Sequence, residues 1–467
     1  MRTNRKTTQA GQAASRLVIR RRPIEDLHPD PRNARIHSPR QIALLAKSIR
    51  HFGFNVPVLV DASGQVLAGH ARLLAAKSLG RCEVPTIELN HLSAAQAKAF
   101  TLADNRLTEL ATWDERLLAE SLQELSLVDL DFELDATGFE MAEIDLRIEQ
   151  LDTVDAETEE AVELPGPNAV AISKPGDLWC LGPHRLLCGN ALLSADYDRL
   201  LGGRKANVVF TDPPYNVPID GHAVGNGQTR HREFAMAVGE MSSIEFTRFL
   251  HQVCLNLRAF STDGSIHYVC MDWRHVGELL AAAQPGFSEW KNLCVWVKDN
   301  AGMGSLYRSQ HELVLVFKNG GAPHVNNVQL GQFGRYRSNV WHYPGANSFS
   351  RTTDEGNLLA LHPTVKPVAM IVDALFDCSK RGDIVLDPFL GSGSTLIAAE
   401  RSGRHCYGIE LDPLYVDTAL RRWQSLTGLQ ATHAESGSTF DRIAAESGVV
   451  AAVPGSPEQE VDHVQVD

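Results

Sequence analysis

Apolar residues recur in two regions of the chain that a polar, acidic stretch separates. In the first region, short apolar runs alternate with turn signals and with two segments of helical spacing. The runs that predict strands are 17–19, 56–61, 66–69 and 84–89, and the helical segments are about 39–52 and 70–79. Residues 93–150 continue with apolar positions at helical spacing. We therefore predict a small α+β domain with a helical extension at residues 16–150.

The second region, about residues 176–428, contains the stronger apolar runs. Strands are predicted at 207–211, 265–270, 293–298, 313–317, 384–387 and 406–410, and helices at about 243–258, 368–379 and 395–402. Strands that alternate with helices along the chain predict an α/β fold with a doubly wound sheet.

Three segments lack such periodicity. Residues 1–15 are polar and predict a flexible arm. Between Asp152 and Glu163 there are six acids and no base, so residues 151–175 are predicted to be an acidic interdomain linker. Residues 429–467 return to small and acidic side chains and predict a flexible tail.

Composition narrows the class of protein. The 467 residues include 44 Lys+Arg and 57 Asp+Glu, a net charge of −13, which excludes a chain that coats nucleic acid through a global positive field. The eight cysteines form no C-x-x-C pair, so neither a zinc ribbon nor a disulfide framework is indicated. Because no apolar run is long enough to cross a membrane and no secretion signal is evident, we expect a cytoplasmic protein.

The tetrapeptide Asp212-Pro213-Pro214-Tyr215 directly follows the predicted strand 207–211. Ligands of open α/β sheets bind at the carboxyl ends of the strands, so this tetrapeptide should face one. The two prolines remove amide donors, which leaves carbonyl oxygens and the Asp212 carboxylate as acceptors beside an aromatic ring. An amino group on a planar base is the complement of such a site. A strand-ending turn with a packed tyrosine is the alternative.

A second motif combines a strand, a glycine-rich loop and a helix over residues 384–403. Its residues of interest are Asp387, Pro388, Phe389, Gly391, Gly393, Ser394 and Thr395. Glycines let a ligand approach the backbone closely, and the start of the helix offers free N–H groups. Glu410 ends the next predicted strand, at a spacing that suits a carboxylate binding ribose hydroxyls. A glycine-rich turn with a surface glutamate is the alternative.

Together these motifs resemble the amino-group DNA methyltransferases that use S-adenosylmethionine (AdoMet). The tetrapeptide looks like their catalytic D-P-P-Y motif, and DPFLGSGST looks like their F-x-G-x-G cofactor loop. The catalytic motif comes first in the chain, which is the order of the β group. The resemblance covers about residues 176–428, and it implies a Rossmann-like fold with a mixed seven-stranded sheet and AdoMet as the cofactor.

Further cofactor residues follow from the resemblance alone. The segment HPTVKP at 362–367 is similar to the element that closes over AdoMet, which implies contacts from His362, Lys366 and Pro367. Asn190 stands where the family more often has an aspartate assigned to the adenine ring of the cofactor, and it keeps an acceptor oxygen without the charge. The resemblance implies neither a metal ion nor a covalent enzyme intermediate.

The resemblance also implies a mechanism of direct in-line transfer. The target base flips out of duplex DNA and stacks on Tyr215, while Asp212 and the Pro213 carbonyl accept its amino hydrogens. Aspartate at the first motif position is commoner in adenine enzymes, so we expect a site-specific adenine methyltransferase of the kind found in DNA modification and restriction-modification. Methylation of the cytosine amino group is the first alternative. The second is a ParB-like partition protein whose methyltransferase half is vestigial.

A locally basic segment, about residues 298–351, is the predicted target-recognition region for double-stranded DNA. Arginine binds phosphates or guanine edges, and asparagine pairs with adenine. The predicted DNA contacts are Lys298, Arg308, Arg335, Arg337 and Asn339. A solvated loop is the alternative. Residues 216–241 are expected to form a mobile loop that closes over the flipped base.

The N-terminal domain resembles the ParB/sulfiredoxin-like domain. The matching segments are PRNAR at 31–35, GHARLLAAKSLG at 69–80 and LADNRL at 102–107. In ParB partition proteins the corresponding G-x-R-R segment binds nucleotide phosphates, but Ala71 replaces the first arginine here. We expect a scaffold that helps to hold DNA, with a bound nucleotide as the alternative. The rest of the chain shows no clear helix-turn-helix domain, and the sequence leaves a homodimer open.

Overall fold

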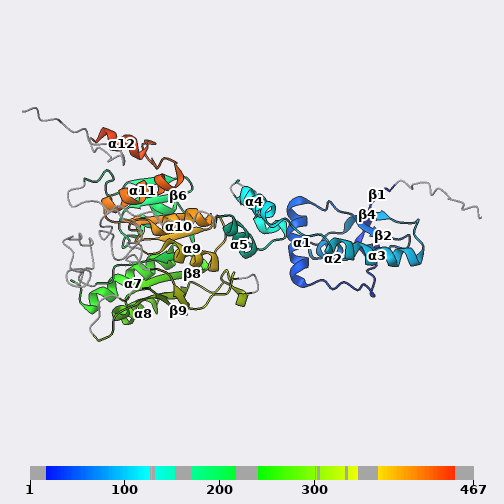
Figure 1. The fold of residues 1–467 in the computed structure, drawn as a ribbon, viewed down its shortest axis with the longest axis horizontal. Coiled ribbons are helices and arrows are strands. Elements are labelled where there is room, and N and C mark those ends of the chain that lie inside the picture. Colours follow the sequence, from blue (N-terminus) through cyan, green and yellow to red (C-terminus); the bar gives the residue numbers. More distant parts are fainter. Residues whose placement is uncertain are drawn as a thin grey trace, which may run out of the picture. The chain divides into compact units, whose positions relative to one another are not determined.

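The computed structural model describes residues 17–126, 128, 132–152, 170–216, 240–299, 301, 306–331, 335–344 and 366–447. The chain divides into two compact units, residues 1–153 and 154–467, which are described separately below (Figure 1). The predicted arm at 1–15, most of the predicted linker and the end of the predicted tail lie outside the described residues. The same holds for residues 217–239, the greater part of the predicted loop over the flipped base.

The first unit is built on a four-stranded sheet in the order β1-β4-β2-β3. Its strands are β1 (Ile19–Pro23), β2 (Val58–Val60), β3 (Val66–Ala68) and β4 (Glu83–Glu88). Its helices are α1 (Pro39–Phe52), α2 (His70–Ser78), α3 (Ala94–Glu109), α4 (Glu115–Ser126) and α5 (Met141–Asp152), with 3-10 turns η1 (Ile24–Asp26) and η2 (Leu134–Thr137). The fully buried Val58, Val60 and Leu73 form the centre of the core between this sheet and α2.

Local chemistry sets the ends of α1 at the predicted residues. The Ser38 side chain accepts a hydrogen bond from the backbone N–H of Gln41, and Pro39 occupies the first helical position. Gly53 ends the helix with a φ of 85°, a conformation that glycine adopts without steric cost. The prediction of a helix over 39–52 is therefore confirmed.

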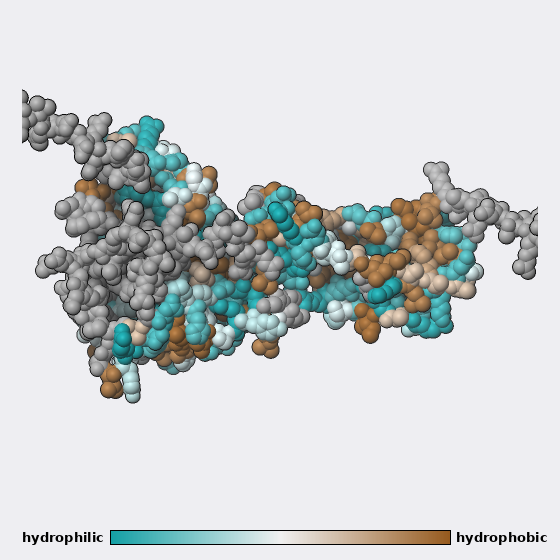
Figure 2. Space-filling model, viewed as in Figure 1, coloured by the Kyte–Doolittle hydropathy of each residue, from teal (hydrophilic) through white to brown (hydrophobic). Residues whose placement is uncertain are grey.

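β1 differs from its prediction, because the apolar run 17–19 largely precedes the strand. Leu17, Val18 and Ile19 are each more than half exposed, and apolar surface gathers near β1 (Figure 2). The strand IRRRP is held instead by antiparallel pairing with β4 and by an ion pair between Arg22 and Glu88. Backbone pairing at a sheet edge, rather than burial of side chains, explains this strand.

The second unit contains a ten-stranded sheet in the order β11-β9-β10-β8-β7-β12-β13-β6-β5-β14. Its strands are β5 (Leu178–Leu181), β6 (His184–Cys188), β7 (Ala206–Thr211), β8 (Ser261–Met271), β9 (Glu289–Val297), β10 (His311–Lys318), β11 (Val340–His342), β12 (Ile384–Asp387), β13 (His405–Glu410) and β14 (Thr432–His433). The six predicted strands are β9, β10, β8, β7, β12 and β13, which are neighbours in this order in the sheet. The sheet is mixed, as expected, but it has ten strands instead of seven among the described residues.

Five central strands of this sheet run in one direction, and antiparallel strands flank them on both sides. β8, β7, β12, β13 and β6 run parallel to one another, whereas β10 is antiparallel to both β8 and β9. The connection after β12 leads through α10 to β13 on one side, and the connection after β7 leads through α7 to β8 on the other. The boundary between β7 and β12 is thus the switch point at which α/β sheets bind ligands.

Two groups of helices cover the two faces of the sheet (Figure 1). One apolar cluster joins the sheet to α9 (Val368–Cys378), α10 (Ser394–Ser402) and α11 (Pro413–Thr427). The other joins it to α6 (Ser194–Leu201), α7 (Ser243–Ala259) and α8 (Val276–Ala283). The short turns η3 (Trp273–His275) and η4 (Gln329–Gly331) complete the described elements before the C-terminal segment. The result is a three-layer α/β/α unit with a buried sheet.

The predicted flexible tail is partly folded, contrary to expectation. β14 pairs with β5, and α12 (Phe440–Glu446) follows it. The ring of Phe440 is 1% exposed and its centroid lies 5.5 Å from that of the fully buried Trp179. Residues 429–447 therefore complete the core, because one large aromatic residue anchors an otherwise polar segment.

Candidate functional site

Both Asp-Pro motifs lie at the same edge of the sheet. Asp212 directly follows β7 and Asp387 ends β12, and these two strands are parallel neighbours with Val209 opposite Leu386. The Thr211 hydroxyl of β7 donates to the Asp387 carboxylate at 2.8 Å, which joins the two strand ends directly. The expectation that the tetrapeptide lies at a strand end where ligands bind is consistent with this arrangement.

Asp212 is held by two donors. The hydroxyl of Tyr215 donates to Asp212 Oδ1 and the Lys366 ammonium donates to Oδ2, each at 2.5 Å. The Lys366 amine also lies 5.3 Å from the centre of the Tyr215 ring. The side chain of Lys366 is only 4% exposed, whereas that of Asp212 is 23% exposed. The carboxylate is therefore the more accessible member of the pair.

A second carboxylate completes this cluster. Glu312, the second residue of β10, lies 3.1 Å from Lys366 through Oε2 and accepts a hydrogen bond from the Tyr215 hydroxyl through the same atom. Its other oxygen, Oε1, accepts from Lys298. We call Asp212, Tyr215, Lys298, Glu312 and Lys366 the carboxylate cluster. Two carboxylates and two lysines make its side-chain charges balance.

Burial and charge shift the pKa values in the carboxylate cluster in different directions. Burial alone would raise the pKa of Glu312, but the charges of Lys366 and Lys298 lower it to about 2. Burial raises the pKa of Asp212, and the charge of Glu312 adds to that rise while Lys366 opposes it. Burial would lower the pKa of Lys366, but both carboxylates raise it far above its ordinary value. Asp212 is therefore the acid of the cluster that is easier to protonate.

Asp387 has a different environment. It is 3% exposed, and it accepts from Thr211 Oγ1, from the backbone N–H of Phe389 at 3.1 Å and from Thr395 Oγ1 at 2.6 Å. Burial raises its pKa to about 6. Because both oxygens accept from protein donors, we interpret Asp387 as a tie between β7 and the glycine loop, and its predicted contact with a cofactor stays a prediction.

The glycine loop and Glu410 come together next to this tie. Gly391 and Gly393 have φ values of 55° and 90°, which favour glycine, and a Cβ added at Gly391 would meet no atom within 4 Å. Glu410 accepts from the backbone N–H groups of Gly391 and Asp412, each at 2.8 Å. Burial raises the pKa of Glu410 to about 7.

The structure describes all but one of the other predicted cofactor residues. Asn190 follows β6, beside the end of β13, and its side-chain oxygen accepts from the backbone N–H of Leu192. Pro388 is buried, and the ring centroid of Phe389 lies 6.0 Å from that of Phe249. The hydroxyl of Ser394 accepts a hydrogen bond from the Arg422 guanidinium. Pro367 directly precedes α9. His362 lies outside the described residues. Lys366 contacts Asp212, as described above.

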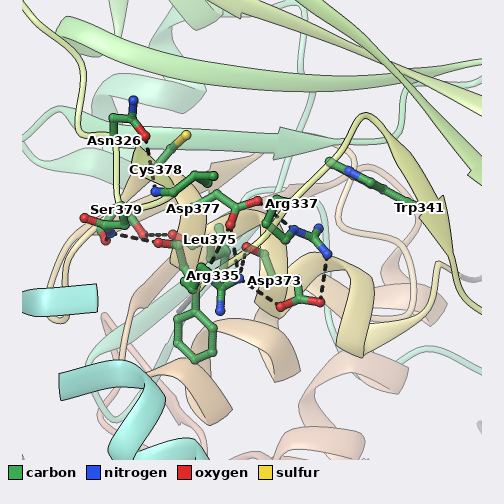
Figure 3. Close-up of polar contacts among 12 residues, drawn as sticks. Asn326, Arg335, Arg337, Trp341, Asp373, Leu375, Asp377, Cys378 and Ser379 are labelled. Carbon is green, nitrogen blue, oxygen red and sulfur yellow. Dashed lines mark hydrogen bonds and ion pairs between the residues drawn. The ribbon is translucent and has the colours of Figure 1, made fainter. Parts of the chain in front are cut away.

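Two residues predicted to contact DNA are held in ion pairs within the fold. Arg335 and Arg337 each bind both Asp373 and Asp377 of α9 (Figure 3). The side chain of Arg335 is 4% exposed, and Arg337 also donates to the hydroxyl of Tyr343. Reaching a DNA phosphate would require Arg335 to break one buried and one partly buried ion pair. The expectation of DNA contacts from this pair is corrected: the two arginines fasten residues 335–343 to α9.

The other three residues predicted to contact DNA are at least partly exposed to solvent. Arg308 is exposed and donates to the backbone carbonyl of Ala301. Asn339 is also exposed, and its amide donates to the Leu293 carbonyl. Lys298 belongs to the carboxylate cluster and lies 4.6 Å from the centre of the Trp296 ring, so its charge is shared with Glu312.

Three site residues escaped prediction from the sequence. Glu312 precedes the apolar run of β10, and only the antiparallel direction of that strand brings it to the edge where Asp212 lies. Thr211 looked like the last residue of a strand. Asn216 has a φ of 53°, and its side chain exchanges two hydrogen bonds with the backbone of Met241. The apolar run after Glu312 and the position of Asn216 after the tetrapeptide were the available signals.

The first unit brings two of its sequence motifs together. Arg35 donates to the backbone and side-chain oxygens of Asn105, each at 3.3 Å. Gly69, with a φ of 100°, precedes α2, and the ring of His70 accepts from the backbone N–H of Asp30. Burial lowers the pKa of Arg72, which donates to the Pro57 carbonyl. A nucleotide at this position stays a prediction.

Two further kinds of feature are absent from the described part of the chain. None of its helices combines the length and apolar character that a membrane crossing requires. Within the same residues, no group of three or more His, Cys, Asp or Glu side chains is arranged to hold a metal ion.

Three known families match different segments of the chain. A family described as DNA methylase matches residues 206–421, and the ParB N-terminal domain matches residues 7–106. A ParB-methyltransferase HTH domain matches residues 116–175. This last match corrects the expectation that the chain has no helix-turn-helix domain. The matched segment includes α5 and most of α4. The spacing of apolar residues predicted helices there, but it did not indicate a helix-turn-helix.

Curated relatives match the two halves separately. The ParB-like nuclease domain-containing protein YnaK of Escherichia coli (strain K12) is 43% identical over 83 residues, which cover 18% of this chain and 95% of that protein. Type II methyltransferase M2.MboI of Moraxella bovis is 23% identical over 231 residues, covering 47% of this chain and 81% of that protein. Type II methyltransferase M.HpaI of Haemophilus parainfluenzae is 24% identical over 252 residues, which cover 52% of this chain and 74% of that protein.

Solved structures with detectable similarity include two complexes with S-adenosylmethionine. M1.HpyAVI in such a complex is 20% identical with a TM-score of 0.36, covering 51% of this chain and 98% of that one. TTHA0409 of Thermus thermophilus, a putative DNA modification methylase also complexed with S-adenosylmethionine, is 22% identical with a TM-score of 0.36, covering 53% and 96%. The PvuII DNA methyltransferase, described as cytosine-N4-specific, is 15% identical with a TM-score of 0.38, covering 56% and 89%.

Proposed function

Because the chain carries a DNA methylase domain of the N6/N4 family and ParB-type domains before it, we propose that it is a site-specific adenine methyltransferase of double-stranded DNA. The proposed reaction moves the methyl group of AdoMet to the exocyclic amino group of adenine. The observation that carries the proposal is the position of the Asp212 carboxylate at the end of β7, beside the glycine loop that follows β12.

The residues at the ends of β12 and β13 fit AdoMet. Glu410 uses one bond from each of two backbone N–H groups, and a carboxylate has about four lone-pair sites, so it can also accept from ribose hydroxyls. Open space at Gly391 lets the cofactor approach the backbone. Asn190, at the neighbouring strand end, is proposed to face the adenine ring. When bound, AdoMet supplies a methyl group activated by a sulfonium.

The chain's own residues orient the acceptor base. We assign to Asp212 and the Pro213 carbonyl the acceptance of the amino hydrogens, which favours an amino nitrogen whose lone pair points toward the methyl group. Tyr215 offers its ring for stacking with the flipped base. Pro213 and Pro214 keep the acceptors in place because they restrict the backbone.

Adenine is preferred over cytosine because the motif begins with aspartate. The family covers both amino groups, so the base is decided by sequencing. Long-read sequencing of DNA from cells that express the chain should show modified adenine in a defined sequence context. Modified cytosine without modified adenine would establish the cytosine alternative and refute the adenine assignment.

Asp212→Ala is the matched control for this experiment. It should abolish methyl transfer from labelled AdoMet while the purified variant still binds the cofactor. Transfer at the wild-type rate by this variant would refute the assigned role of Asp212. A wild-type protein that binds DNA but methylates none would favour the ParB-like alternative with a vestigial methyltransferase half.

A further inference from the structure

Both oxygens of the proposed catalytic carboxylate are engaged in this structure. Asp212 Oδ1 accepts from Tyr215 and Oδ2 accepts from Lys366, each at 2.5 Å. An amino group of a base would have to compete with a hydroxyl and an ammonium for the same two oxygens. Hydrogen bonds from charged donors are the stronger kind, so a second acceptor for Lys366 would ease this competition.

Glu312 is positioned as that acceptor. Its Oε2 lies 3.1 Å from Lys366 Nζ and 3.1 Å from the Tyr215 hydroxyl, which are the two donors that hold Asp212. Its other oxygen is bound by Lys298, which fixes the side chain. Glu312 is 13% exposed, so water competes little for its oxygens. One atom of Glu312 is therefore within reach of both donors.

We propose that Glu312 is a positioning residue, which takes over the Lys366 and Tyr215 hydrogen bonds when the amino group of the target base reaches Asp212. The exchange frees an Asp212 oxygen to accept an amino hydrogen, while Lys366 keeps an anionic partner in Glu312. It requires only short movements of donors that already contact both acids. This inference rests on the proposed function, because it presumes that a base with an amino group is the substrate.

The charges of the site agree with this exchange. The pKa of Glu312, lowered to about 2 by Lys366 and Lys298 against burial, keeps this acid ionised and able to accept over the neutral pH range. The charged and titratable groups that face Asp212 from the neighbouring elements are Lys366, Glu312, Tyr215, Cys270 and Asp387, and Lys298 faces Glu312. Removing the charge of Glu312 takes away one of the causes that raise the pKa of Asp212.

The test compares Glu312→Gln with Glu289→Gln in the full chain. Glu289 lies on the neighbouring β9, half exposed and paired with Lys291, so its variant controls for a lost carboxylate on the same sheet. We expect Glu312→Gln to lower the single-turnover rate of methyl transfer about 10²-fold. Affinities for AdoMet and DNA should stay unchanged, and Glu289→Gln should match the wild type.

The pH profile separates this role from a merely structural one. With Glu312→Gln, the acid limb of the profile should move to lower pH, because the lost negative charge lowers the pKa of Asp212. Glu312→Asp keeps the charge but shortens the side chain, so it should lower the rate without moving the acid limb. If Glu312→Gln fails to fold, Glu312→Asp decides the question by its rate.

Wild-type rate together with an unmoved acid limb in Glu312→Gln would overturn the inference. So would a wild-type rate in Glu312→Asp. Failure of the proposed function is a different result: in that case the wild-type protein itself transfers no methyl group to any DNA.

Discussion

Two aspartate-proline pairs end two adjacent parallel strands, and their surroundings differ completely. Asp212-Pro213 follows β7 and is held by an ammonium and a phenol, both of which have Glu312 as a second acceptor. Asp387-Pro388 ends β12 and is held by two threonine hydroxyls and a backbone N–H. The same dipeptide at the same edge thus provides one exchangeable acceptor and one fixed tie. The hydrogen-bond donors around each aspartate, rather than the motif, decide which of these two roles it has.

The same isosteric change at both positions should give the largest contrast. Asp212→Asn keeps the size of the side chain but removes the charge that accepts the amino hydrogens. We expect methyl transfer to fall about 10³-fold, as when a single preorganised group is removed from an active site. The measurement is single-turnover transfer of labelled methyl from AdoMet, with cofactor affinity measured by calorimetry.

Asp387→Asn is the internal control for that measurement, because it makes the identical chemical change one strand away. It should retain most of the transfer rate. If both asparagine variants lost activity equally, the distinction between an exchangeable acceptor and a fixed tie would be wrong.

Glu410, the carboxylate that ends β13, should show an effect of intermediate size, which appears in the pH dependence of AdoMet binding. Burial raises the pKa of Glu410 to about 7. Donors on the ribose favour the ionised form, so AdoMet affinity should weaken as the pH falls below about 7, approaching about tenfold per pH unit. Calorimetric titrations between about pH 5.5 and 8 measure this slope.

Glu410→Gln should remove the pH dependence because it cannot ionise. The exposed Glu435 provides the control variant Glu435→Gln, which should retain the wild-type slope. An equal slope in Glu410→Gln and in the wild type would show that another group titrates.

The smallest expected effect concerns the contribution of Asp387 to the free energy of unfolding. Asp387 has a pKa of about 6 in the folded chain, above the ordinary value of about 3.9. The folded state therefore binds its proton more tightly, so the stability from this group is present below about pH 4 and is lost as the pH rises through about 6. Urea unfolding at several pH values should show this decline in wild type.

Asparagine resembles the protonated acid, so Asp387→Asn should flatten the decline of the unfolding free energy over the same pH range. Asp198→Asn, a change at an exposed position, should leave it as in the wild type. A decline that persists unchanged in Asp387→Asn would mean that the pKa shift of Asp387 is not its cause.

Much of the second unit could be predicted because its sheet is buried on both faces. Apolar runs marked six central strands, and the Asp-Pro dipeptides marked two of their carboxyl ends. The edge strands β11 and β14 are short and have no comparable run, so periodicity missed them. The buried Phe440 likewise lies in a polar context that predicted a tail.

The site could be predicted only where its residues adjoin a motif. Glu312 reaches Asp212 because β10 runs against its neighbour β8, and strand direction is not written in a hydrophobic pattern. Arg335 and Arg337 looked like DNA contacts because their partners, Asp373 and Asp377, are far away in the sequence. A local excess of positive charge can therefore reflect long-range ion pairs instead of a nucleic-acid surface.

The paired hydrogen bonds between Asn216 and Met241 have a consequence for how this enzyme can be altered. The Asn216 side chain joins its own position to the backbone of Met241, 25 residues further along the sequence. Closing a longer loop costs little additional entropy, since the cost grows only with the logarithm of its length. We therefore expect a change in the number of residues between these two positions to cost little stability, because the two hydrogen bonds hold the segments that lead to β7 and α7 together.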